Sequence, residues 1–116
     1  MEKININKSN ARHYSWGTGC ESWVYMESEN LSVKHEKMPA GTKEQLHYHK
    51  KAQQFFFILQ GEATFYLEGD KNIIAPQCGI WITPGQQHYI ANETDQPLEF
   101  LVISQPDTTH DRTNIE

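Results

Sequence analysis

Apolar and polar residues alternate with a period of two along most of the chain. In a β-strand successive side chains point to opposite faces, so this alternation predicts strands rather than helices. Glycine and proline recur between the alternating segments and mark turns. We therefore expect strands at 31–38, Gln53–Gln60, 62–68, 73–75, 80–82, 88–92 and 98–104, with a hairpin turn at 69–72.

No window of about eleven residues has its apolar positions at helical spacing, so the fold is expected to be all-β. Many short strands separated by glycine and proline are typical of a sandwich or a barrel. Residues 55–59 are apolar on both faces. One face should fill the barrel, and the other should lie against a second sheet or a partner subunit. Trp16 and Trp23 indicate that the first thirty residues pack onto the barrel, whereas the polar tail after Pro106 is expected to be irregular.

The composition narrows the class of protein. With 116 residues the chain is the size of one domain and can bury a core of its own. Ten Lys and Arg against fifteen Asp and Glu give a net charge of −5, which opposes a nucleic acid or an anionic membrane as partner. No apolar stretch is long enough to cross a membrane, and residues 1–8 lack the apolar run of a signal peptide. We expect a cytoplasmic protein in which Cys20 and Cys78, far apart in the sequence, are free thiols.

Three histidines stand out by their spacing. His47 and His49 are one residue apart, so on a strand they share a face, with Cα atoms roughly 6.5 Å apart. Both rings can then reach one metal ion at about 2.0–2.1 Å from a ring nitrogen. His88 would supply a third imidazole from a distant strand, because inward side chains of several strands meet inside a barrel. Each His alone could be an ordinary surface or core residue, but the three together favour a metal site.

The residues around these histidines resemble the two sequence motifs of the cupin superfamily. The first motif, G-x5-H-x-H-x3,4-E-x6-G, is matched by Gly41, His47, His49, Gln54 and Gly61, with Gln54 where the family usually has Glu. The second motif, G-x5-P-x-G-x2-H-x3-N, is matched at Gly85, His88 and Asn92, with Gln77 and Thr83 in place of the first Gly and the Pro.

The resemblance implies an all-β, jelly-roll type cupin β-barrel. Residues 1–116 would form a single cupin domain, with a barrel core at about 31–104 and terminal segments packed on it or on a partner subunit. It also implies one divalent transition metal, Zn, Fe, Ni or Mn, held by His47, His49, Gln54 and His88.

Position 54 decides the charge of this site. A neutral carboxamide in place of a carboxylate leaves the metal centre one unit more positive, which should weaken metal binding and strengthen the ion as a Lewis acid. Gln54 could bind the metal through its amide oxygen, or lie behind the ligands as a hydrogen-bond donor. Gln53 competes for the same role, but only Gln54 gives the six-residue gap to Gly61.

Strand parity predicts which neighbours share the interior with the ligands. Phe56 and Ile58 have the parity of Gln54, and Ile90 and Asn92 have that of His88, so these four are candidates for lining the pocket. In the segment 31–38 the apolar residues Leu31 and Val33 are in phase with His35, which we expect to point inward or to an interface. Trp81 is out of phase with its apolar neighbours and is expected at an interface or in packing between sheets.

Two classes of function fit these features. The first is a metal-dependent enzyme acting on a small molecule such as a sugar or an oxo-acid, of the isomerase, epimerase, lyase or dioxygenase type. The alternative is a non-catalytic small-molecule binding or sensing module. We favour the enzyme, although no residue outside the expected ligands stands out as a general base. We also expect a homodimer, because residues 55–59 carry a second apolar face, and we expect no nucleic-acid or membrane partner.

Overall fold

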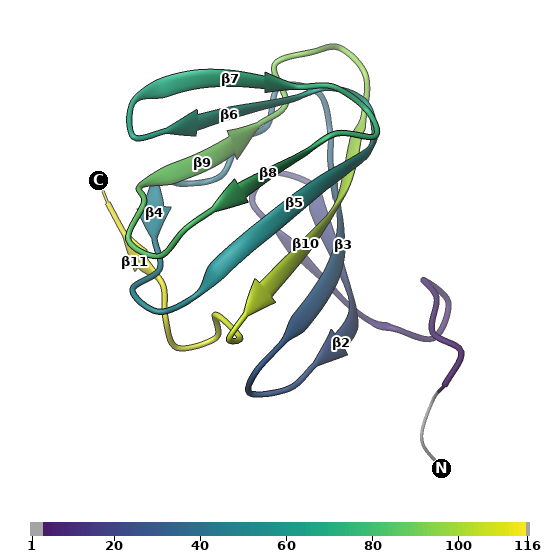
Figure 1. Ribbon diagram of the computed structural model, residues 1–116. Helices are drawn as coiled ribbons and strands as arrows, with labels where there is room; N and C mark the ends of the chain where they lie inside the picture. The colour runs from purple at the N-terminus through teal and green to yellow at the C-terminus, as the bar shows by residue number, and fades with distance from the viewer. Residues whose placement is uncertain (1–3, 116) are drawn as a thin grey trace.

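The computed structural model describes residues 4–115, and these residues form eleven β-strands and no helix. The strands are β1 (Arg12–Trp16), β2 (Cys20–Glu27), β3 (Ser32–Met38), β4 (His47–Tyr48), β5 (Gln53–Gln60), β6 (Ala63–Leu67), β7 (Asp70–Ile74), β8 (Gly79–Ile82), β9 (His88–Ala91), β10 (Leu98–Gln105) and β11 (Thr113–Asn114). They form a six-stranded sheet in the order β1-β2-β3-β10-β5-β8 and a five-stranded sheet in the order β11-β4-β9-β6-β7 (Figure 1). All strand pairs are antiparallel, so the expected all-β, jelly-roll type fold is confirmed.

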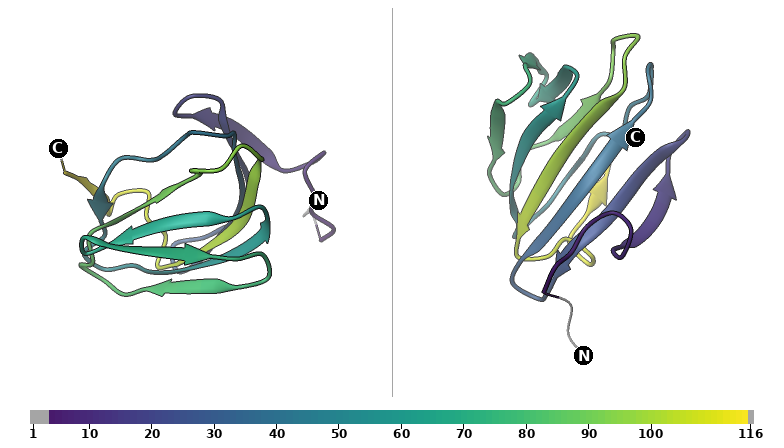
Figure 2. Two further views of the ribbon diagram at one scale, coloured as in Figure 1. Left: turned by 90° about the horizontal axis from the view of Figure 1, so that it is seen from above. Right: turned by 90° about the vertical axis from the view of Figure 1, so that its right-hand side faces the viewer.

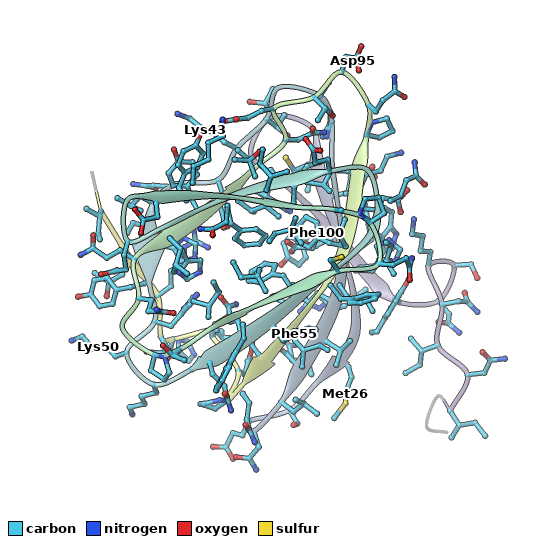
Figure 3. The ribbon with its side chains drawn as sticks, turned by 45° about the horizontal axis from the view of Figure 1, so that its top comes forward. Met26, Lys43, Lys50, Phe55, Asp95 and Phe100 are labelled. Carbon is cyan, nitrogen blue, oxygen red and sulfur yellow. The ribbon has the colours of Figure 1, made fainter. Side chains whose placement is uncertain are left out.

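The two sheets curve round a shared hydrophobic interior (Figure 2). Three phenylalanines hold its centre. The Phe56 ring lies 4.9 Å from that of Phe65 and 5.7 Å from that of Phe100, measured between centroids. Phe100 lies between the sheets in Figure 3, whereas Met26 lies at the periphery. Within residues 4–115, no helix has the length and apolar character needed to span a membrane.

Strands with strong alternation fall where the sequence predicts them, but one hairpin does not. The expected turn at 69–72 is wrong, because Leu67 pairs with Asp70 and only Glu68 and Gly69 connect the strands. Both connecting residues have positive φ, 50° and 85°, as a two-residue type I′ turn requires. The strand β7 therefore begins at Asp70 rather than at 73. Of the two connecting residues, the sequence placed only Gly69 in the turn, because glutamate seldom adopts a positive φ.

The terminal segments are more regular than expected. The hairpin of β1 and β2 extends the large sheet through pairing with β3, and Trp16 packs against the core, as expected of the first thirty residues. The tail after Pro106 is not wholly irregular, because Thr113 and Asn114 form β11 against β4. A two-residue strand leaves no alternation to detect in a sequence.

The inward face of β3 is the opposite of the one expected. Ser32 and Met38 are buried, and Lys34 and Glu36, in phase with them, line an internal cavity. Val33 and His35 lie on the outer face of the sheet, beside Ile103 and Leu101, so the inward position expected for His35 is wrong and its alternative position at an interface stays a prediction. The prediction fails because this strand lines a polar cavity, so the more polar set of side chains is the inward one.

Candidate metal centre

The three expected histidines lie together inside the barrel. His47 opens β4, His49 follows that strand, and His88 opens β9, where it pairs directly with His47. Their ring centroids are 4.4 Å apart for His47 and His88, 5.0 Å for His47 and His49, and 5.7 Å for His49 and His88. One nitrogen from each ring lies within 4.8 Å of the others, and all three side chains are buried, so the group could hold a metal ion.

Backbone carbonyls fix the tautomer of all three rings. His47 Nδ1 donates to the Gln45 carbonyl at 2.7 Å, and His88 Nδ1 donates to that of Gln86 at 2.9 Å. His49 Nδ1 donates to the carbonyl of Asp111 at 2.7 Å. Because a carbonyl oxygen only accepts, the proton must be on Nδ1, and each neutral ring presents the lone pair of Nε2. This is the form in which histidine binds metals, with Nδ1–H oriented by a second group.

Burial keeps these rings neutral. Desolvation is the largest influence on each pKa, which falls to about 3 for His47 and about 4 for His88 and is also lowered for His49. The nearby Arg112 guanidinium lowers the pKa of His47 further. At neutral pH none of the three needs to lose a proton before it can bind a cation.

Gln54 brings a fourth acceptor to the same point. Its Nε2 donates to Ser104 Oγ at 3.0 Å, which turns Oε1 toward His88 Nε2 at 3.3 Å. With the His88 proton on Nδ1, these two atoms face each other as two acceptors without a proton between them. His49 Nε2 is also buried and has no hydrogen-bond partner in the part of the chain that is described. A cation among them would satisfy all of these lone pairs, so the residues present fit a metal ion.

Three nitrogens and one amide oxygen form a ligand set suited to the expected metals Zn, Fe, Ni or Mn. The competing candidate, Gln53, is directed elsewhere. Its Nε2 donates a hydrogen bond to Gln105 Oε1 at 2.7 Å, and its Oε1 accepts one from the Trp81 indole at 2.9 Å. Alternation along β5 therefore places Gln54, and not Gln53, beside the histidines.

A cavity of about 470 Å³ opens beside His47, His49 and Gln54. Of the four candidates for lining this pocket, Phe56 does so. Ile58, Ile90 and Asn92 are buried but lie outside the residues that line it. The Asn92 amide donates instead to the Met38 carbonyl at 3.0 Å and the Gln96 carbonyl at 2.8 Å, and so holds a loop. Parity correctly predicted that these side chains point inward but could not say how far along the barrel the cavity extends.

Two carboxyl groups in the cavity were not found from the sequence. Glu36 accepts a hydrogen bond from Ser22 Oγ, and Glu44 accepts one from the Ile90 amide at 3.1 Å. Burial raises the pKa of both, that of Glu44 to about 8. The structure therefore adds two candidates for a general base that the sequence did not single out. Glu36 is two residues before the buried Met38 in β3, so strand parity counted from Met38 would have placed Glu36 on the inward face. No local pattern marks Glu44.

Known proteins share both the sequence family and the fold. The sequence model described as "Cupin domain" matches residues 34–104. An uncharacterized protein of Methanocaldococcus jannaschii, MJ1618, is 32% identical over 78 residues, which are 67% of this chain. The matched part spans 62% of that relative's length.

Solved structures match nearly the whole chain. The polyketide cyclase RemF from Streptomyces resistomycificus superposes with a TM-score of 0.84 at 14% identity, covering 100% of this chain and 87% of that one. A sugar phosphate isomerase of the cupin superfamily from Silicibacter pomeroyi gives 0.81 at 17% identity, covering 97% and 82%. At such identities the likeness concerns the fold, while the match over 34–104 concerns the sequence itself. With both in agreement, this chain belongs to the cupin family.

Proposed function

We propose that this protein is a metal-dependent enzyme acting on a small molecule such as a sugar or an oxo-acid, with one divalent metal bound by His47, His49, His88 and Gln54. The observation that carries the proposal is the convergence of unprotonated acceptors at the wall of a polar cavity. Within residues 4–115 His49 Nε2 has no hydrogen-bond partner, and Gln54 Oε1 faces His88 Nε2 without a proton between them.

A metal bound there would act as a Lewis acid on a substrate oxygen. We assign proton transfer to the two carboxyl groups of the cavity, Glu36 and Glu44. With a pKa near 8, Glu44 can hold or release a proton close to neutral pH, as a general acid or base must. Its carboxyl is positioned by the Ile90 amide on one oxygen and by Arg112 at 3.8 Å from the other. This set suits proton transfer next to a polarised oxygen, the step common to isomerases, epimerases and many lyases. Similar folds include enzymes described as a sugar phosphate isomerase and a polyketide cyclase.

Metal analysis tests the site directly. We expect about one divalent transition metal per chain after expression in metal-replete medium, because four buried ligands converge there. His47→Ala and His88→Ala should each abolish binding and leave a folded barrel by circular dichroism. The matched control is His13→Ala, since His13 lies on β1 and bonds Glu21 away from the cavity. Metal content that survives either ligand substitution would contradict the assignment.

Turnover separates the enzyme from the binding module. Metal-loaded protein should convert at least one member of a panel of sugars, sugar phosphates and oxo-acids, followed by NMR. Glu44→Gln should abolish that conversion while metal content is retained. Saturable binding without conversion by the unmodified protein would favour a sensing or binding role.

A further inference from the structure

The chain after β10 crosses from the large sheet to the small one and ends as β11 beside β4 (Figure 1). We call residues 107–115 the C-terminal strap. Three of its residues, Thr108, Arg112 and Asn114, line the cavity next to the histidines. The strap is therefore part of the wall of the candidate site.

Asp111 fastens this strap to the loop that follows His49. Its carboxylate accepts hydrogen bonds from three consecutive amides, Lys50 at 2.9 Å, Lys51 at 3.0 Å and Ala52 at 2.9 Å. These three bonds account for the lowered pKa of Asp111, despite its partial desolvation. The Asp111 carbonyl accepts the Nδ1 proton of His49 at 2.7 Å. One residue thus holds the strap in place and fixes the orientation of a candidate metal ligand.

Arg112, the next residue, carries a positive charge into the cavity. Its Nε donates to Asn114 Oδ1 at 2.8 Å, and its nearest carboxylate, Glu44, is 3.8 Å from Nη1. Side chains that line the cavity include three cations, Lys34, Lys43 and Arg112, against the two carboxyl groups Glu36 and Glu44. A bound dication would add to this excess of positive charge.

Within the described chain, a second cation at the cavity also lacks an anionic partner among its hydrogen bonds. Lys34 Nζ has a neutral partner there, donating to Tyr14 Oη at 3.2 Å. Such donors call for a ligand that brings acceptor oxygens.

We propose that the C-terminal strap makes this cavity a site for an anionic small molecule, whose carboxylate or phosphate group is bound by Arg112 while Asp111 holds the strap closed. The inference rests on the proposed function and names the substrate class. A guanidinium suits both groups because it can donate two parallel hydrogen bonds to a pair of oxygens. At about 470 Å³, the cavity has room for a single small metabolite.

Calorimetric titration of zinc-loaded protein tests the role of Arg112. The ligands are pyruvate, which carries a carboxylate, and ribose 5-phosphate, which carries a phosphate. We expect at least one to bind, and Arg112→Gln to weaken that binding about tenfold or more, the usual effect of losing a charge-assisted hydrogen bond. Whichever ligand shows this loss identifies the anionic group.

Arg12→Gln is the matched control. Arg12 is the other arginine of the chain, pairs with Glu27 at 3.1 Å on β1 and β2, and does not line the cavity. Equal affinities in the two variants, or no binding of either anion by loaded protein, would overturn the inference. A protein that takes up no zinc would instead contradict the proposed function, so the two failures are distinguishable.

The positioning role of Asp111 has its own measurement. Asp111→Ala keeps the carbonyl that orients His49 but removes the three amide contacts that hold it in place. It should therefore weaken zinc affinity about tenfold or more, the lower end of what disturbing an orienting partner of a metal ligand costs, and should weaken anion binding together with it. Asp107→Ala, in the same strap, removes a contact with Thr109 and should change neither. Zinc and anion affinities that are unchanged in Asp111→Ala would show that the strap does not support the site.

Discussion

At the scale of single residues, the site depends on which atoms carry protons. Carbonyl partners place the proton of each histidine on Nδ1, and Ser104 turns the amide oxygen of Gln54 toward them. The sequence could predict the histidines from their spacing, and Gln54 from the resemblance to the first cupin motif. It could not predict Glu44, because that side chain reaches the cavity through contacts with Ile90 and Arg112, which are distant in sequence.

The substitution Gln54→Glu tests whether position 54 contacts the metal. A carboxylate adds one negative charge to the ligand set, so we expect zinc affinity to rise about tenfold or more. Competition with a chromogenic chelator measures this change. The control is Gln53→Glu, whose side chain lies toward Gln105 and Trp81 and should leave the affinity unaltered. An unchanged affinity in Gln54→Glu would place this residue outside the ligand set.

Glu44 should make the stability of the metal-free protein depend on pH. Burial raises its pKa to about 8 in the folded state, whereas a Glu in an unfolded chain titrates near 4.3. The unfolded chain therefore gives up this proton first as the pH rises, and stability is lost between about pH 4.5 and 8, by up to about 1.4 kcal/mol per pH unit.

Glu44→Gln removes this titration, so the difference in stability between variant and unmodified protein should grow in favour of the variant from pH 4.5 to 8. Urea unfolding of metal-free samples at several pH values measures it. A difference that stays constant over this range would show that Glu44 is ionised in the folded protein with an ordinary pKa.

At the scale of elements, the strands that alternate apolar and polar residues are found where the sequence predicts them, and the exceptions have local causes. In β3 the inward side chains are polar because they line the cavity, which reverses the apparent parity. β4 and β11 are two residues each and depend on pairing with neighbours. The hairpin of β6 and β7 requires a positive φ at Glu68, a conformation that its residue type does not suggest.

The glycine that follows β5 tests how closely the turn between β5 and β6 packs against the loop before β10. Gly61 has φ of 84°, and a Cβ there would lie 2.5 Å from the Pro97 carbonyl oxygen. Gly41 has φ of 76° but open space where a Cβ would be. Gly41→Ala should cost about 1–2 kcal/mol of unfolding free energy, from backbone conformation alone. Gly61→Ala should cost about 1–3 kcal/mol more, because the backbone of Pro97 must move. Denaturant titrations measure both losses of unfolding free energy. Equal losses in the two variants would mean that the loop at Pro97 can move at no energetic cost.

At the scale of the whole molecule, the large sheet keeps one apolar face outside the barrel. Phe55 is 40% exposed and Trp81 62%, and the two are directly paired across β5 and β8. Phe57 lies beside Leu101, and Phe55 beside Ile103, on the same face. A contiguous apolar face of this kind is typical of a protein–protein contact.

We predict that this face forms a homodimer. Trp81→Glu would place a charge in the contact, so it should lower the mass measured by light scattering at micromolar concentration from dimer to monomer. Ile73→Glu is the control, because Ile73 is 58% exposed but lies on β7 of the other sheet. A monomer mass for the unmodified protein would contradict the prediction.

The sequence by itself determined the all-β class, the long strands and the candidate ligands, because the strands follow from alternation, the histidines from their spacing, and Gln54 from the resemblance to the cupin motif. Tertiary structure alone decided how the site is completed. Glu36, Glu44, Asp111 and Arg112 come from segments that meet only after the sheets close. Glu36 contacts Ser22, Glu44 contacts the Ile90 amide, and Asp111 contacts the amides of residues 50–52, all far away in sequence. Alternation separates the two sides of a strand, but only the closed barrel decides which side is inward and whether it meets apolar core or a polar cavity.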